Sequence, residues 1–66
     1  MDPLEHLWDQ LLSRQPEQIR AAYALLSPDE QASVLRHLER MASEPGWHPE
    51  QVLSARTALR ALEAAS

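Results

Sequence analysis

Three histidines are the side chains in this sequence best suited to binding a metal ion. Two ligands on one helix share a face when they are three or four residues apart, and His6 and Asp9 have this spacing. Neither His37 nor His48 is followed by a carboxylate at those positions. Because nothing nearby in the sequence completes a ligand set around His6, we predict no metal site and no cofactor.

Paired carboxylates are the next candidates, because general acid-base catalysis often uses two acidic side chains. Glu5 with Asp9, and Asp29 with Glu30, are the pairs. A catalytic carboxyl needs a pKa shifted by burial or by a close like charge. Both pairs lie away from the apolar positions of their segments, so we expect a solvated helical face at each.

The usual nucleophiles are also missing or lack their context. The chain has no Cys and no Lys, which excludes a thiol nucleophile, a thiolate zinc ligand and a lysine Schiff base. Its one glycine, Gly46, cannot supply the flanking glycines of a serine nucleophile elbow or of a phosphate-binding loop. We therefore predict that the protein is not an enzyme and has no small-molecule substrate.

The charge is distributed unevenly. The formal net charge is −4, and all of it falls in residues 1–33, whereas residues 34–66 are balanced. An acidic half repels a phosphate backbone, whose binding depends on clustered basic side chains. We do not expect the chain to bind nucleic acid by itself.

Four arginines could nevertheless form an anion-binding surface. They occur as two pairs with i, i+4 spacing, Arg36 with Arg40 and Arg56 with Arg60. Such guanidinium groups can converge on an anion or an acidic partner. Glu44 and Glu63 lie one turn beyond Arg40 and Arg60, however, and we favour an ordinary mixed-charge face.

The segment Leu26–Arg36, LSPDEQASVLR, resembles the opening helix of the helix-turn-helix in sigma-factor region 4 and in response-regulator DNA-binding domains. Beyond this segment the chain departs from that pattern, because a loop with Pro45, Gly46 and Pro49 leads into a single terminal helix. The resemblance and the arginine pairs support an alternative function, a transcription-associated or nucleic-acid-binding helical module that uses Arg36, Arg40, Arg56 and Arg60.

Prolines divide the chain into helical segments, because proline is well tolerated at the first position of a helix. We predict helices over residues 3–13, 16–26, 28–43 and 49–65. Asp2 with Glu5, and Ser27 with Glu30, have the spacing of capping boxes. Gln15 is a poor cap, so the junction at Pro16 is either a break between two helices or a kink in one. Trp47 is placed to pack on Val52 as a hydrophobic staple.

Apolar residues recur with the helical period in every segment, and no segment alternates with period two. The predicted fold class is all-α, a small bundle of three to four helices in one domain. The loop around Gly46 joins the two longest segments, which we expect to form a long antiparallel helical hairpin.

Some apolar side chains fall outside these stripes. Leu25 and Leu53 lie well away from the apolar stripe of their helices, and the two tryptophans are too large to be fully buried in so small a domain. A chain of 66 residues without disulfides also has little core of its own. We therefore predict a self-associating surface, with these interface candidates: Trp8, Leu25, Trp47, Leu53, Leu59 and Leu62.

The sequence thus favours a non-catalytic helical module that binds other protein chains. We expect it to bind a second copy of itself as a homodimer, another protein, or both, and to act as an assembly or regulatory subunit. No apolar run is long enough for a membrane span, and the first residues do not form a signal peptide. The expected location is the cytoplasm.

Overall fold

Four helices make up the protein in the computed structural model, which describes the backbone of residues 3–64 and the side chains of residues 6–63. They are α1 (Pro3–Leu11), α2 (Pro16–Ala24), α3 (Pro28–Ser43) and α4 (Pro49–Ala64), and no strand occurs within this range. The prediction of an all-α fold is confirmed. The capping box predicted at Asp2 and Glu5, and the end of the last helix at residue 65, lie outside the described part.

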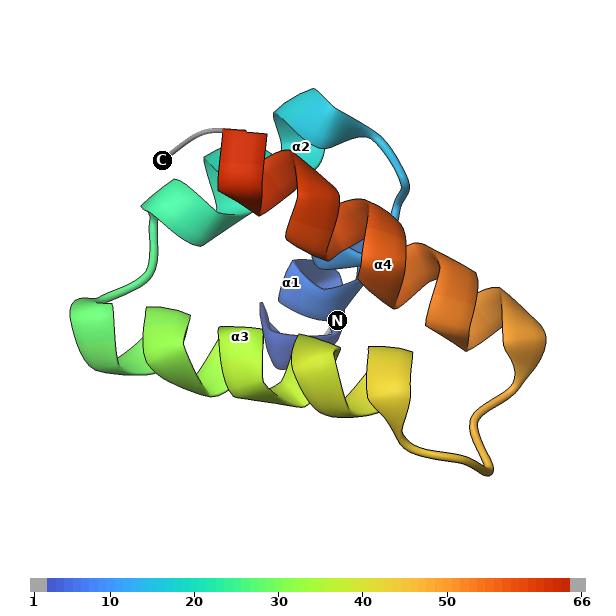
Figure 1. Ribbon diagram of the computed structural model, residues 1–66. Coiled ribbons are helices and arrows are strands. Elements are labelled where there is room, and N and C mark those ends of the chain that lie inside the picture. Colours follow the sequence, from blue (N-terminus) through green and yellow to red (C-terminus); the bar gives the residue numbers. More distant parts are fainter. Residues whose placement is uncertain (1–2, 65–66) are drawn as a thin grey trace.

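The helices form a small bundle in which α3 and α4 pack against each other and α2 packs against α1 and α4. The chain reverses direction between α3 and α4, and α1 lies behind these two helices in the view of Figure 1. Between the helices lies a core of small and medium apolar side chains. Its buried members are Leu11, Ile19, Ala22, Val34, Leu38, Met41, Ala55, Ala58, Ala61 and Leu62.

Two helices end earlier than the sequence suggested. Helix α1 stops at Leu11 and not at residue 13, and α2 stops at Ala24 and not at residue 26. Arg14 adopts a positive φ of 64°, which turns the chain sharply out of α1. The Gln31 side chain donates a hydrogen bond to the backbone carbonyl of Tyr23 at 3.0 Å and so satisfies a carbonyl near the end of α2. Pro16 therefore starts a separate helix, which settles the alternative of a kink.

Helix α3 starts with the capping box that the sequence predicted. The Ser27 hydroxyl accepts a hydrogen bond from the Glu30 backbone N–H at 3.3 Å, and the Glu30 carboxylate accepts one from the Ser27 N–H at 2.9 Å. The hydrogen bond that the carboxylate accepts from the Ser27 backbone lowers the pKa of Glu30 from its ordinary value, and the nearby Ser27 side chain lowers it further. The box pairs two N–H groups that would otherwise have no partner within the helix.

Replacing this cap should measurably weaken the fold. Ser27→Ala is expected to lower the free energy of unfolding by about 1 kcal/mol, the usual cost of losing a serine N-cap. Chemical denaturation followed by circular dichroism measures this change. Ser43→Ala removes the same hydroxyl at the other end of α3, where it donates to the Glu39 carbonyl and caps no N–H. A loss as large in Ser43→Ala as in Ser27→Ala would contradict a capping role.

Helix α4 starts at Pro49, as predicted, with polar contacts that the sequence did not indicate. His48 precedes the helix, and its Nδ1 accepts a hydrogen bond from the Glu50 N–H at 3.2 Å, while the Gln51 side chain accepts one from the His48 N–H at 3.1 Å. The Trp47 ring makes an edge-to-face contact with the His37 ring of α3. Gly46, at a φ of 96°, supplies the left-handed turn that the connecting loop requires.

Within residues 3–64, no helix combines the length and the apolar character that crossing a lipid bilayer requires.

Candidate functional site

The two tryptophans of the chain lie on either side of one histidine. The ring centroids of Trp8 and His37 are 4.9 Å apart with planes inclined at 62°, and those of His37 and Trp47 are 5.9 Å apart at 80°. Both pairs have the edge-to-face geometry that aromatic rings prefer. The cluster thus joins α1, α3 and the loop before α4, three segments that are distant in the sequence.

A groove opens between α1 and α3, next to this cluster. It has a volume of about 400 Å³, within the range of about 300–1,000 Å³ usual for ligand sites. Its lining residues are Leu7, Trp8, Leu26, Asp29, Glu30, Ser33, Val34 and His37. Trp8 and His37 belong to both the groove and the cluster. Trp47 does not line the groove but packs against His37.

The groove combines apolar walls with acidic groups at the start of α3. Asp29 and Glu30 are exposed, and no arginine is among the lining residues. Glu30 is already held by the capping box, while Asp29 makes no hydrogen bond or ion pair with the other residues that the structure describes. The groove therefore offers apolar contact together with negative charge.

The two leucines that fall outside the apolar stripes, Leu25 and Leu53, are exposed, but they do not form one patch. Leu25 is 87% exposed and Leu53 is 50% exposed. Leu25 follows α2, beside the connection to α3, while Leu53 lies in the first half of α4. Figure 1 shows the end of α2 and the first half of α4 on opposite sides of the molecule. Each could contribute to a contact with another chain, but one small interface would not contain both.

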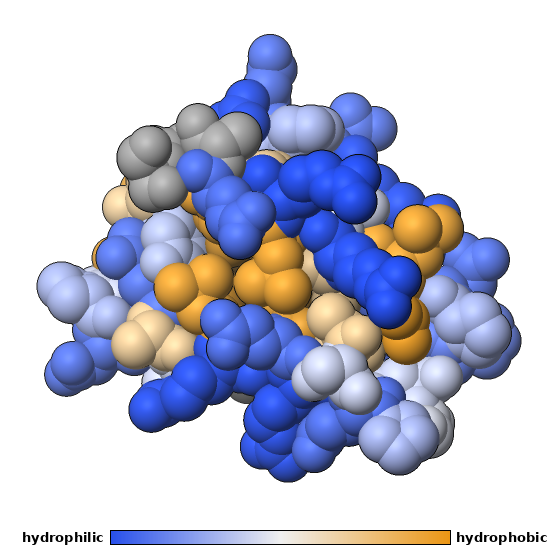
Figure 2. Space-filling model, in the orientation of Figure 1, coloured by the Kyte–Doolittle hydropathy of each residue, from blue (hydrophilic) through white to orange (hydrophobic). Residues whose placement is uncertain are grey.

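The other two interface candidates on α4 lie further inside. Leu62 is 7% exposed and belongs to the core, so it does not lie on the surface that an interface requires. Leu59 is half-buried and packs on the core. Both leucines lie on the side of α4 that faces the rest of the bundle, which explains their burial. Figure 2 shows apolar side chains gathered between the polar edges of α3 and α4 on the face in view.

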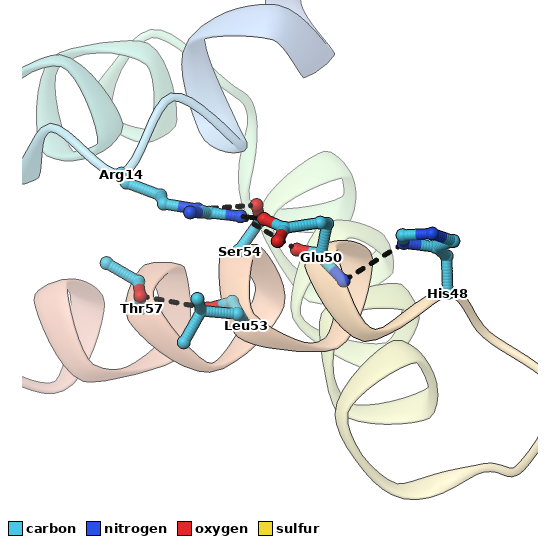
Figure 3. Close-up of polar contacts among 6 residues, drawn as sticks. All are labelled: Arg14, His48, Glu50, Leu53, Ser54 and Thr57. Atoms are coloured by element: carbon cyan, nitrogen blue, oxygen red, sulfur yellow. Dashed lines mark hydrogen bonds and ion pairs between the residues drawn. The ribbon is translucent and has the colours of Figure 1, made fainter.

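The sequence analysis did not predict a set of hydrogen bonds that Arg14 makes with α4. Its Nε donates to the Ser54 hydroxyl at 3.0 Å, and its Nη2 donates to the Glu50 backbone carbonyl at 3.1 Å and to the Glu50 carboxylate (Figure 3). Ser54 is the one buried polar residue among those described. The hydrogen bond and the charge of Arg14 lower the pKa of Glu50 from its ordinary value. The arrangement ties the α1–α2 turn to α4.

The four arginines proposed as an anion site are all exposed. The Arg40 guanidinium forms an ion pair with Glu44 at 3.3 Å, as predicted, and the Arg36 guanidinium donates to the Ser33 hydroxyl at 3.4 Å. These contacts are those of a mixed-charge helical face.

Among the described residues, no group of three or more His, Asp or Glu side chains is placed to hold a metal ion. His6 is exposed on α1. Comparisons of this chain with protein-family models, with curated proteins and with solved structures find no match.

Proposed function

We propose that this chain is a non-catalytic helical interaction module that self-associates, and that it serves as an assembly or regulatory subunit. The observation that carries the proposal is the exposure of Leu25, at 87%, in a chain whose largest fully buried side chains are only Leu11, Ile19 and Leu38. A small core gives the chain little stability of its own, and a large exposed apolar side chain can be buried against another chain. Both features favour association with another chain.

The energetic argument rests on desolvation. Burying a leucine side chain contributes about 2 kcal/mol. In a two-fold symmetric dimer the same residue is buried twice, once from each chain. Leu53 offers a second, separate centre for such a contact, so Leu25 and Leu53 define two alternative interfaces that single variants can distinguish.

Sedimentation equilibrium at micromolar concentrations tests self-association. We expect the wild-type chain to show the mass of a dimer, and Leu25→Ser or Leu53→Ser to shift the mass toward the monomer, depending on which leucine lies at the interface. Ala32→Ser is the matched control, because Ala32 is exposed on α3 and its side chain contributes little apolar area. The proposal would be contradicted if the wild type is a monomer and both leucine variants are as soluble and as stable as the wild type.

The absence of cysteine is compatible with a reducing compartment and supports the cytoplasm as the location of this module.

A further inference from the structure

The groove between α1 and α3 has an apolar interior that the described side chains, those of residues 6–63, leave open. Leu7, Trp8, Leu26 and Val34 contribute the apolar part of its lining, and His37 forms part of the wall that the two tryptophans support. Grooves between helices commonly receive the apolar face of a helix from another protein. A volume of about 400 Å³ suits the few anchor side chains that such a helix inserts.

The charge of the groove indicates the chemistry of the occupant. Asp29 and Glu30 are the charged lining residues, and both are acidic. All of its lining residues except Val34 and His37 belong to residues 1–33, the half of the sequence that carries the whole net charge of −4. Complementary charge guides the encounter of two proteins and suppresses association with like-charged partners. A second copy of this chain would bring its own acidic groove residues with it, whereas a basic segment would meet opposite charge.

We propose that the groove between α1 and α3 binds a basic amphipathic helical segment of another protein, with the partner's apolar side chains against Trp8, Leu26 and Val34 and its lysines or arginines beside Asp29. This surface is separate from Leu53 and includes Leu26 rather than the exposed Leu25. The inference therefore goes beyond self-association and does not depend on it.

Three synthetic peptides provide the probes. The first has leucines at i, i+3, i+4 and i+7 with lysines at the other positions, and the second has glutamates in place of the lysines. A third peptide has the composition of the first in a scrambled order that destroys the amphipathic pattern. Binding to the full chain is followed through the two tryptophan indole N–H signals in ¹H–¹⁵N spectra, which Trp47→Phe assigns.

Two neighbouring substitutions on α3 separate the groove from the rest of the surface. Ser33 is exposed and lines the groove, so Ser33→Phe fills the groove without removing a core side chain. Ala32 is exposed and does not line the groove, so Ala32→Phe adds the same bulk outside it. Asp29→Asn removes one charge and leaves the capping box in place.

We expect the lysine peptide to bind saturably with one peptide per chain and to shift the Trp8 indole signal. Ser33→Phe should weaken this binding by about tenfold or more, because it introduces a steric clash. Asp29→Asn should weaken it by about threefold, as is usual for one exposed charge pair. Ala32→Phe should bind like the wild type, and the scrambled and glutamate peptides should bind weakly.

Four results would overturn the inference. They are the absence of saturable binding, unchanged affinity in Ser33→Phe, equal affinity for the scrambled peptide, and equal affinity for the glutamate peptide. If the lysine peptide does not bind but Ser33→Phe converts a dimer into a monomer, the occupant is a second copy of this chain. If the chain is monomeric in sedimentation and still binds the lysine peptide as described, self-association is wrong and the groove assignment stands.

Discussion

Leu38→Ala is expected to lower the free energy of unfolding by about 2–5 kcal/mol, the usual cost of truncating a fully buried leucine. Leu38 is 0% exposed at the centre of α3. The loss combines the transfer free energy of the deleted methyl groups with the cavity they leave. Because a domain of this size is stabilised by only about 3–10 kcal/mol, this variant should be partly or wholly unfolded at room temperature.

Urea denaturation followed by circular dichroism measures this effect. Leu25→Ala makes the same chemical change at a side chain that is 87% exposed. Its stability, measured at several protein concentrations and extrapolated to low concentration, should lie within about 0.5 kcal/mol of the wild type. Leu38→Met, which conserves volume, should cost less than about 1.5 kcal/mol. Equal losses in Leu38→Ala and Leu25→Ala would mean that Leu38 is not a central core residue.

Arg14→Ala is expected to destabilise the protein by about 1–2 kcal/mol. The Ser54 hydroxyl loses its donor, and because it is buried, a polar group left there without its partner is costly. The exposed Glu50 carbonyl also loses the bond from Arg14, but water can replace it. The ion pair with the exposed Glu50 carboxylate adds little, since water screens it. Arg14→Gly loses the same bonds but relieves the positive φ of 64°, so it should be about 1 kcal/mol more stable than Arg14→Ala.

The pH dependence of the stability distinguishes the contact of Arg14 with the Glu50 carboxylate from the backbone strain at residue 14. Arg14 lowers the folded-state pKa of Glu50 below its ordinary value of 4.5. The resulting stability is present above pH 4.5 and is lost as the pH falls through the lowered folded-state pKa. The stability gap between the wild type and Arg14→Ala should therefore narrow in acid, while the gap between Arg14→Ala and Arg14→Gly should not change. If the difference in stability between the wild type and Arg14→Ala stays constant from neutral pH to pH 3, the Arg14–Glu50 contact is contradicted.

The helix starts at Pro16, Pro28 and Pro49 were predictable because they depend on local chemistry. Proline suits the first turn of a helix, and Ser27 and Glu30 need only each other's backbone to form a cap. The early end of α2 was not predictable in the same way. Besides the Leu26 N–H, the Tyr23 carbonyl accepts a hydrogen bond from the Gln31 side chain, which belongs to the next helix.

The candidate site was predicted only in part. The sequence singled out Trp8 and Trp47 as large rings that the core could not bury, and both are half-buried. It considered His37 only as a metal ligand without a partner at helical spacing, and it did not indicate that both tryptophans would pack on that ring. Arg14 carried one usable signal, as a lone arginine between two helices, but its partners lie 36 and 40 residues further along the chain.

The sequence by itself determined that this chain is all-α, where its helices begin, and which chemistry it lacks, because composition, capping and period are properties of neighbouring residues. Only the tertiary structure decided that α1 lies across from α3 with a groove between them, that Leu62 is buried in the core, and that Arg14 reaches α4. These features depend on the angles at which helices cross and on side-chain contacts between distant segments, and the helical period of one segment carries no information about either.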